Sequence, residues 1–154
     1  MTRYFAYGSN MDGRTMQRTV PEATVVGPGR LNGFRLEFNV YSDRWKGGAA
    51  NLEPDEDGHV WGVVWEIPEA ALEDLDTFIG HPTFYRREGV TVDLAGGEPT
   101  ECETYRVAHQ KGYLRPTPQY LARLRAAVRL QGLPPEALDI IEAAARPPRP
   151  HIST

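Results

Sequence analysis

The residues with the clearest potential for chemistry stand near the start of the sequence, in Tyr7-Gly8-Ser9-Asn10. Glycine lets the main chain turn sharply and lets a ligand approach the backbone closely. If a helix begins at Asn10 or Met11, its first backbone amides lack partners within the helix and can bind a carboxylate or a phosphate. Ser9 and Asn10 add side-chain hydrogen bonds at the same place. The segment therefore predicts a small anion-binding site, with a plain helix cap at Ser9 or Asn10 as the alternative.

Length and composition limit the class of protein. The 154 residues are 40% hydrophobic and 25% charged, which is close to the norm for globular proteins. We expect one domain over residues 1–146, followed by a Pro-rich tail over residues 147–154. The formal net charge of −4 argues against nucleic acid as a partner, because phosphate binding favours a basic surface.

Other features favour a cytoplasmic protein without a membrane partner. Cys102 is the single cysteine, so no intramolecular disulfide forms, and its alternating context favours a small core residue. The N-terminus lacks the pattern of a signal peptide, and no apolar run is long enough to span a membrane. The sequence does not indicate an oligomeric state. No metal and no cofactor are predicted, because metal-ligand spacing is lacking among His59, His81, His109 and His151.

Hydrophobic periodicity predicts the elements that must position the candidate site. The expected strands are residues 3–7, 24–40 with turns at 27–29 and 32–33, 59–67, 84–94 and 101–108. The expected helices are residues 10–20, 68–80, 117–131 and 135–145. The stretch WKGGAA, residues 45–50, is typical of a flexible loop. Strands outnumber helices and most connections are short, so we expect an α+β fold with a mixed or antiparallel sheet and helices packed outside it.

Five stretches, in order, resemble the γ-glutamyl cyclotransferase family. The first is YFAYGSNM, which is similar to the opening signature of that family. The others are WKGGAANLEPDEDGHVWGVVWEI, LEDLDTFIGHPTFYRREGVTV, TYRV and PTPQYLARLRAAVRLQGLP. The resemblance extends from Tyr4 to Leu133, nearly the whole chain. It implies a small mixed β-barrel flanked by helices, with the active site at one mouth of the barrel.

The resemblance also implies a reaction. Family enzymes cyclise a γ-glutamyl group: its α-amine attacks the γ-carbonyl, which gives 5-oxoproline and releases an amine or an amino acid. The backbone of Gly8-Ser9-Asn10 then holds the glutamyl carboxylate or the developing oxyanion, and such fixed donors contribute a few kcal/mol. The expected partner is a small-molecule substrate that carries a carboxylate. The tyrosines that the resemblance places in the pocket, each with the alternative of a core aromatic, are Tyr7, Tyr85 and Tyr105.

One position departs from the family pattern. The family normally has a glutamate before the glycine that ends the second helix, whereas this chain has Ile79 before Gly80. A carboxylate can take the proton of the substrate α-ammonium, whose pKa is about 8 when free, and return it to the leaving amine. Isoleucine can do neither, and loss of such a base typically costs a factor of about 10² to 10⁴. Ile79 is expected either to enter the pocket or to complete the apolar helix face of Leu72 and Leu75.

Three residues near Ile79 are candidates for a relocated base. Asp76 lies on the same helix face as Ile79, although it could instead tie down the helix. His81 has a suitable unperturbed pKa, with a solvated loop residue as the alternative. Glu88 falls on the next strand, where an arginine is its simplest partner.

Three functions remain open at this point. The first is a γ-glutamyl cyclotransferase-like enzyme that acts on a γ-glutamyl amine or a related small amide through a relocated base. The second is a family member with different chemistry, which needs no carboxylate at position 79. The third is a non-catalytic module that binds a small acid or a partner protein.

Overall fold

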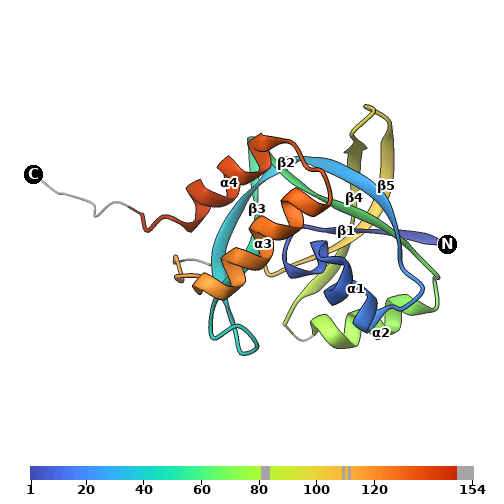
Figure 1. The fold of residues 1–154 in the computed structure, drawn as a ribbon, viewed down its shortest axis with the longest axis horizontal. Coiled ribbons are helices and arrows are strands. Elements are labelled where there is room, and N and C mark those ends of the chain that lie inside the picture. The colour runs from blue at the N-terminus through green and yellow to red at the C-terminus, as the bar shows by residue number, and fades with distance from the viewer. Residues whose placement is uncertain (81–83, 109, 111, 149–154) are drawn as a thin grey trace, which may run out of the picture.

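The computed structural model describes residues 1–80, 84–108, 110 and 112–148 and contains a closed β-barrel (Figure 1). Its strands are β1 (Thr2–Ala6), β2 (Thr24–Ser42), β3 (Gly47–Ile67), β4 (Arg86–Leu94) and β5 (Pro99–Arg106). Their order around the barrel is β1-β3-β2-β4-β5. β1 pairs in parallel with β5, and the other pairs among the described strands are antiparallel. The predicted α+β class and the small mixed barrel are confirmed.

β2 and β3 are the longest strands and form one antiparallel hairpin of 19 and 21 residues. The prediction of turns at residues 27–29 and 32–33 is wrong, because both sites lie inside the continuous strand β2. Gly27 and Gly33 have φ values of 144° and 88°, which an L side chain rarely adopts. These glycines belong to bulges, which add a residue to one strand and bend it. The register shifts lie between Val25 and Gly27, Asn32 and Phe34, and Phe38 and Val40.

The predicted loop over residues 45–50 is wrong from Gly47 onward, because β3 begins there. The two glycines serve a close approach of two backbone segments. A Cβ on Gly48 would lie 1.9 Å from the carbonyl oxygen of Leu114. The backbone N–H of Gly48 donates to the carbonyl of Arg115 at 2.9 Å. Glycine inside a strand often marks such an approach.

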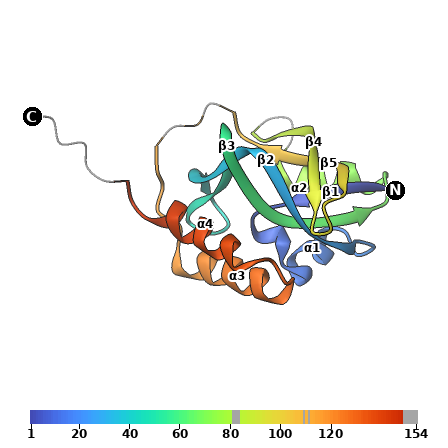
Figure 2. The same ribbon diagram turned by 90° about the horizontal axis from the view of Figure 1, so that it is seen from above.

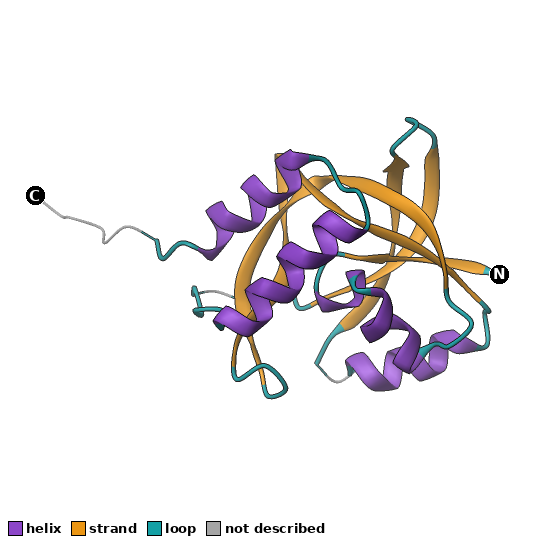
Figure 3. Cartoon of the chain, viewed as in Figure 1, coloured by secondary structure: helices purple, strands orange, loops and turns teal. Residues whose placement is uncertain are grey.

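The helices lie outside the strands of the barrel (Figure 3). α4 (Pro135–Ala145) contacts β2 and β3, and α3 (Pro118–Leu130) lies beside α4 in both ribbon views (Figures 1 and 2). The short turn η1 (Ser9–Met11) and α1 (Gly13–Thr19) follow β1, and α2 (Ala71–Ile79) follows β3. Within the described ranges, every helix is too short or too polar to reach across a bilayer.

One hydrophobic cluster joins the barrel to the helices. Phe5 of β1, Leu52 of β3, Leu75 of α2 and Leu124 of α3 all have 0% exposure. Burial of their apolar surface drives these elements together. Cys102 belongs to the same cluster, so the prediction of a small core residue is confirmed. Burial raises the pKa of its thiol to about 12, which keeps the thiol protonated at neutral pH.

Gly48→Ala is expected to destabilise the protein. The new methyl group meets the Leu114 main chain, so β3 or residues 114–115 must move. We expect the free energy of unfolding, measured by urea denaturation, to fall by about 1–3 kcal/mol. Gly89→Ala is the matched control, because it lies in β4 and a Cβ there meets no atom within 4 Å. Equal losses in the two variants would contradict the close-approach explanation.

Candidate functional site

A cavity of about 340 Å³ lies beside the turn that follows β1. Its walls bring together the residues that the sequence predicted for the site: Tyr7, Gly8, Ser9, Asn10, Ile79, Tyr85 and Tyr105. They come from the end of β1 and η1, the end of α2, the segment before β4, and β5. A cavity of this volume suits a small molecule. Substrate binding by these residues stays a prediction.

Sequence reasoning missed other residues that line this cavity, which are Tyr4, Ser42, Arg44, Trp45, Ala49, Ala50, Phe78 and Tyr120. Ala49 and Ala50 fell in the stretch that was interpreted as a loop, and Tyr120 fell on a helix expected to pack outside the sheet. Six of these eight residues lie in the stretches that resemble the family, which was the available signal, whereas Ser42 and Arg44 lie outside those stretches.

The segment after β1 forms a 3₁₀ turn, η1, instead of the predicted start of an α-helix. The N–H of Met11 donates to the carbonyl of Gly8 at 3.0 Å, and the N–H of Asp12 donates to the carbonyl of Ser9 at 3.1 Å. Within the described part of the chain, the N–H groups of Ser9 and Asn10 have no such acceptor. Both residues line the cavity, so their two N–H groups are candidate donors for an anion.

Side chains behind η1 hold the turn in place. Nε1 of Trp65 donates to the carbonyl of Asn10 at 3.0 Å, and Nε2 of Gln131 donates to the carbonyl of Met11 at 3.1 Å. Nδ2 of Asn10 donates to the hydroxyl of Tyr4 at 3.2 Å. A turn that is fixed before a ligand arrives needs little reorganisation when charge develops on that ligand.

Asp12 caps α1, so the predicted cap at Ser9 or Asn10 is wrong. Oδ2 of Asp12 accepts from the backbone N–H of Thr15 at 3.1 Å and from its hydroxyl at 2.9 Å. Arg123 of α3 contacts the same oxygen at 3.1 Å. Burial tends to raise the pKa of Asp12, but these donors outweigh it and hold the pKa below its ordinary value. Asp12 thus ties the turn and α1 to α3.

Tyrosines form much of the cavity wall, and burial keeps their hydroxyls neutral. It raises the pKa of Tyr4 and of Tyr85 to about 12. It also raises the pKa of Tyr7, Tyr105 and Tyr120 above the ordinary value. At neutral pH these hydroxyls therefore act as hydrogen-bond donors or acceptors and not as anions.

Most of these hydroxyls already have partners within the protein. Tyr7 donates to the carbonyl of Tyr105 at 2.5 Å, and Tyr120 accepts from the N–H of Ala50 at 3.0 Å. No hydrogen-bond partner for the Tyr85 hydroxyl occurs among the described residues. Tyr85 is therefore a neutral donor that a ligand in the cavity can use.

Ile79 is the last residue of α2 and lines the cavity. Gly80 follows it with φ at 105°, in the left-handed conformation that ends the helix as predicted. Ile79 is half-buried and also packs against the hydrophobic cluster. The described residues that line the cavity include no carboxylate and no imidazole.

The candidate bases differ in where they lie. Oδ1 of Asp76 accepts from the hydroxyl of Tyr105, and Nε of Arg87 lies 3.4 Å from the same oxygen. Glu88 pairs with Nε of Arg106 at 2.7 Å, so its predicted arginine partner is confirmed. His81 lies outside the described residues. Asp76 is therefore the candidate with a contact to the cavity wall, through Tyr105.

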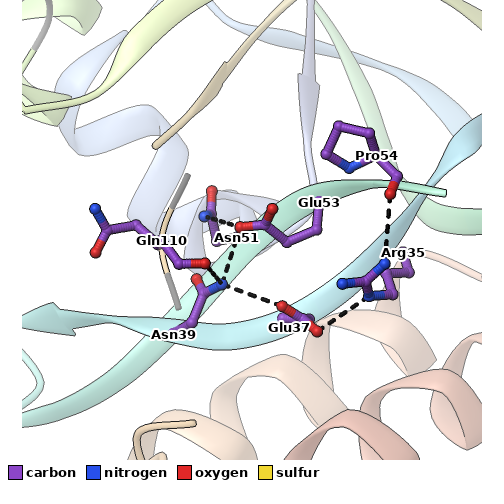
Figure 4. Close-up of polar contacts among 7 residues, drawn as sticks. All are labelled: Arg35, Glu37, Asn39, Asn51, Glu53, Pro54 and Gln110. Atoms are coloured by element: carbon purple, nitrogen blue, oxygen red, sulfur yellow. Dashed lines mark hydrogen bonds and ion pairs between the residues drawn. The ribbon is translucent and has the colours of Figure 1, made fainter. Parts of the chain in front are cut away.

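A second cavity, of about 470 Å³, lies between β2 and the end of α4. Its polar side belongs to a cluster on β2 and β3 in which Nδ2 of Asn39 donates to Glu53 at 3.0 Å and to the carbonyl of Gln110 at 3.4 Å (Figure 4). Asn51 joins this cluster and accepts from the N–H of Val107 at 3.0 Å. These groups bind one another and fix the chain that leaves β5. Among the described residues, no three His, Cys, Asp or Glu side chains are placed to hold a metal ion.

Comparison with known families identifies the family to which this fold belongs. The sequence model of the family described as "Gamma-glutamyl cyclotransferase, AIG2-like" matches residues 4–122. The chain belongs to this family. The family predicted from the sequence is thereby confirmed.

Relatives and solved structures agree with membership of the γ-glutamyl cyclotransferase family. The chain is 32% identical over 138 residues to a gamma-glutamylcyclotransferase of Bos taurus, covering 86% of this chain and 73% of the relative. It is 30% identical over 145 residues to the gamma-glutamylcyclotransferase of Mus musculus, covering 91% of this chain and 77% of the relative. A solved gamma-glutamyl cyclotransferase superposes with a TM-score of 0.88 at 29% identity over 99% of this chain and 92% of that one. The crystal structure of YkqA from Bacillus subtilis superposes with a TM-score of 0.78 at 26% identity, over 94% of this chain and 54% of that one.

Asp12→Ala is expected to destabilise this cyclotransferase-family fold at neutral pH but less in acid. Loss of an N-cap costs about 0.5–2 kcal/mol. The folded-state pKa of Asp12 is lowered, so its stabilisation is present above the unfolded pKa of about 3.9 and is lost as pH falls through the folded value. Urea midpoints from neutral pH down to about pH 3 measure the difference. Asp139→Ala, on the exposed face of α4, is the control. A difference that stays constant with pH would contradict this role.

Proposed function

We propose that this protein is a γ-glutamyl cyclotransferase that acts on a γ-glutamyl amine or a related small amide and releases 5-oxoproline. The observation that carries the proposal is one cavity lined by Ser9, Asn10, Tyr85 and Tyr105, where the N–H groups of Ser9 and Asn10 have no backbone acceptor among the described residues. Family membership and the names of the relatives support the same reaction class.

In this proposal the backbone turn η1 binds the negative charge of the substrate. The N–H groups of Ser9 and Asn10 donate to the glutamyl α-carboxylate or to the oxyanion that develops on the γ-carbonyl. Because Trp65 and Gln131 fix the turn from behind, these donors keep their positions during the reaction. The Tyr85 hydroxyl supplies a further neutral donor.

The reaction moves one proton from the attacking amine to the leaving amine. The α-amine nitrogen bonds to the γ-carbon, the amide C–N bond breaks, and no water is consumed. Ile79 cannot carry this proton, so we assign the role to Asp76 acting through Tyr105. The Tyr105 oxygen accepts the proton of the amine while its own proton passes to Asp76, and the reverse transfer protonates the leaving amine.

Asp76→Asn and Tyr105→Phe are expected to lower kcat/KM for 5-oxoproline release by about 10²-fold each. Asparagine keeps an oxygen that accepts from Tyr105 but cannot take up the proton. The measurement is chromatographic detection of 5-oxoproline from a panel of γ-glutamyl amides over a range of pH. Asp74→Asn, on the exposed face of the same helix, is the control. Full activity in a folded Asp76→Asn variant would contradict the relay.

Ile79→Glu is expected to raise kcat/KM by about 10²-fold or more, because it places a carboxylate on the cavity wall. Ile79→Gln has nearly the same shape without a base and is the matched control. The same 5-oxoproline assay measures both variants, with rates rising as the new carboxylate ionises. A glutamate variant no faster than the glutamine variant would show that the pocket does not present a substrate amine at this position.

A second candidate function is ligand binding without turnover. The observation that favours it is that Ile79 lines the cavity while the described wall residues include no carboxylate. This function requires a measurable dissociation constant for a γ-glutamyl ligand with no 5-oxoproline formed by the wild-type protein. Turnover by the wild-type protein would exclude it.

A further inference from the structure

Arg44 contributes a positive charge to the cavity wall. It lies in the turn between β2 and β3, and its guanidinium carbon is 5.6 Å from the ring centroid of Trp45 and 5.6 Å from that of Phe78. Trp45 belongs to the same turn, whereas Phe78 belongs to α2 and directly precedes Ile79. Arg44 therefore bridges two separate sides of the cavity. Because Arg44 and Phe78 are both exposed, this bridge lies where the cavity meets solvent.

The charge of Arg44 has no carboxylate partner among the described residues. Arg123 provides a contrast, because it lies 5.8 Å from the centroid of the same Trp45 ring but pairs with Asp12 at 3.1 Å. A guanidinium that stacks on an aromatic ring keeps its N–H donors directed outward in its own plane, where an anion can bind them. The described wall residues include no acidic side chain that would compete.

The two kinds of donor lie at different depths of one cavity. Asn10 is 7% exposed and the tyrosine hydroxyls are neutral, whereas the cation Arg44 is at the open end. The γ-glutamyl group carries its carboxylate and its attacking amine at the end that must reach the buried donors. The substituent on the far side of the amide then extends toward Arg44.

We infer that Arg44 is a specificity-determining residue whose guanidinium binds a carboxylate on the leaving group. The inference rests on the proposed function and narrows its substrates from γ-glutamyl amines and related amides to those amides whose leaving group is an amino acid. A leaving amino acid brings a carboxylate to the cavity rim, a leaving alkylamine brings no charge, and a leaving diamine brings a cation that Arg44 repels. The protein thus selects γ-glutamyl amino acids over γ-glutamyl amines.

A pair of ligands that differ only in this carboxylate tests the inference. The probes are γ-L-glutamyl-L-alanine and γ-L-glutamyl-L-alaninamide, titrated calorimetrically at low ionic strength, with 5-oxoproline assayed in each sample to correct for turnover. We expect the wild-type protein to bind the free acid about fivefold more tightly than the amide. Arg44→Gln is expected to remove this preference, because it weakens binding of the free acid and leaves binding of the amide unchanged. The matched control is Arg18→Gln, on the exposed face of α1, which should leave both dissociation constants unchanged.

Two further variants sharpen the test. Arg44→Glu is expected to reverse the preference, because it places like charge opposite the acid. Arg44→Lys is expected to keep part of it, because it retains the charge without the planar guanidinium. Equal binding of acid and amide by the wild-type protein, or equal weakening of both by Arg44→Gln, overturns the role of Arg44 while the γ-glutamyl pocket stands. If the folded wild-type protein binds neither ligand, the proposed function and this inference fail together.

Discussion

The parallel pairing of β1 with β5 is the constraint on which the site depends, because it closes the barrel. Tyr4 pairs with Glu103, and the buried hydroxyl of Thr104 donates to the carbonyl of Phe5 at 2.9 Å. This closure places the end of β1 beside the end of β5, so that Tyr7 donates to the backbone of Tyr105. The turn that follows β1 and the tyrosine that contacts Asp76 thus share one cavity, although about a hundred residues separate them in sequence.

The balance of charge in the cavity follows from which groups are buried. The buried tyrosines stay neutral because ionisation would place charge in a poorly solvated region. The carboxylate of Asp76 accepts from the hydroxyl of Tyr105, which lines the cavity, and lies next to Arg87. A glutamyl carboxylate that enters this cavity therefore meets oriented dipoles, with a single described cation at the rim. Such an environment holds an anion without a buried counter-charge.

Local sequence signals predicted much of this molecule and failed where distant contacts decide the structure. The helix stop at Gly80 follows from residues close in sequence and is confirmed. The arginine partner of Glu88 is also confirmed, although that arginine is Arg106 on the neighbouring strand β5. The glycines of β2 and Gly48 were misinterpreted as turn and loop residues. Glycine reports only that the backbone needs freedom or space, and a bulge, a turn or the distant Leu114 carbonyl can each be the cause. Arg44 and Phe78 were missed for the same reason, since their contact joins a hairpin turn to α2.

The turn that carries Arg44 and Trp45 lies outside the ladder of backbone hydrogen bonds that closes the barrel. Substitutions at its exposed positions therefore leave the strand register intact. A side chain at Gly48, only a few residues later, would instead collide with the main chain of Leu114 and disturb β3. Because of this separation, substitutions in the turn can change which molecules bind at the cavity entrance during evolution, and no compensating substitutions in the barrel are needed first.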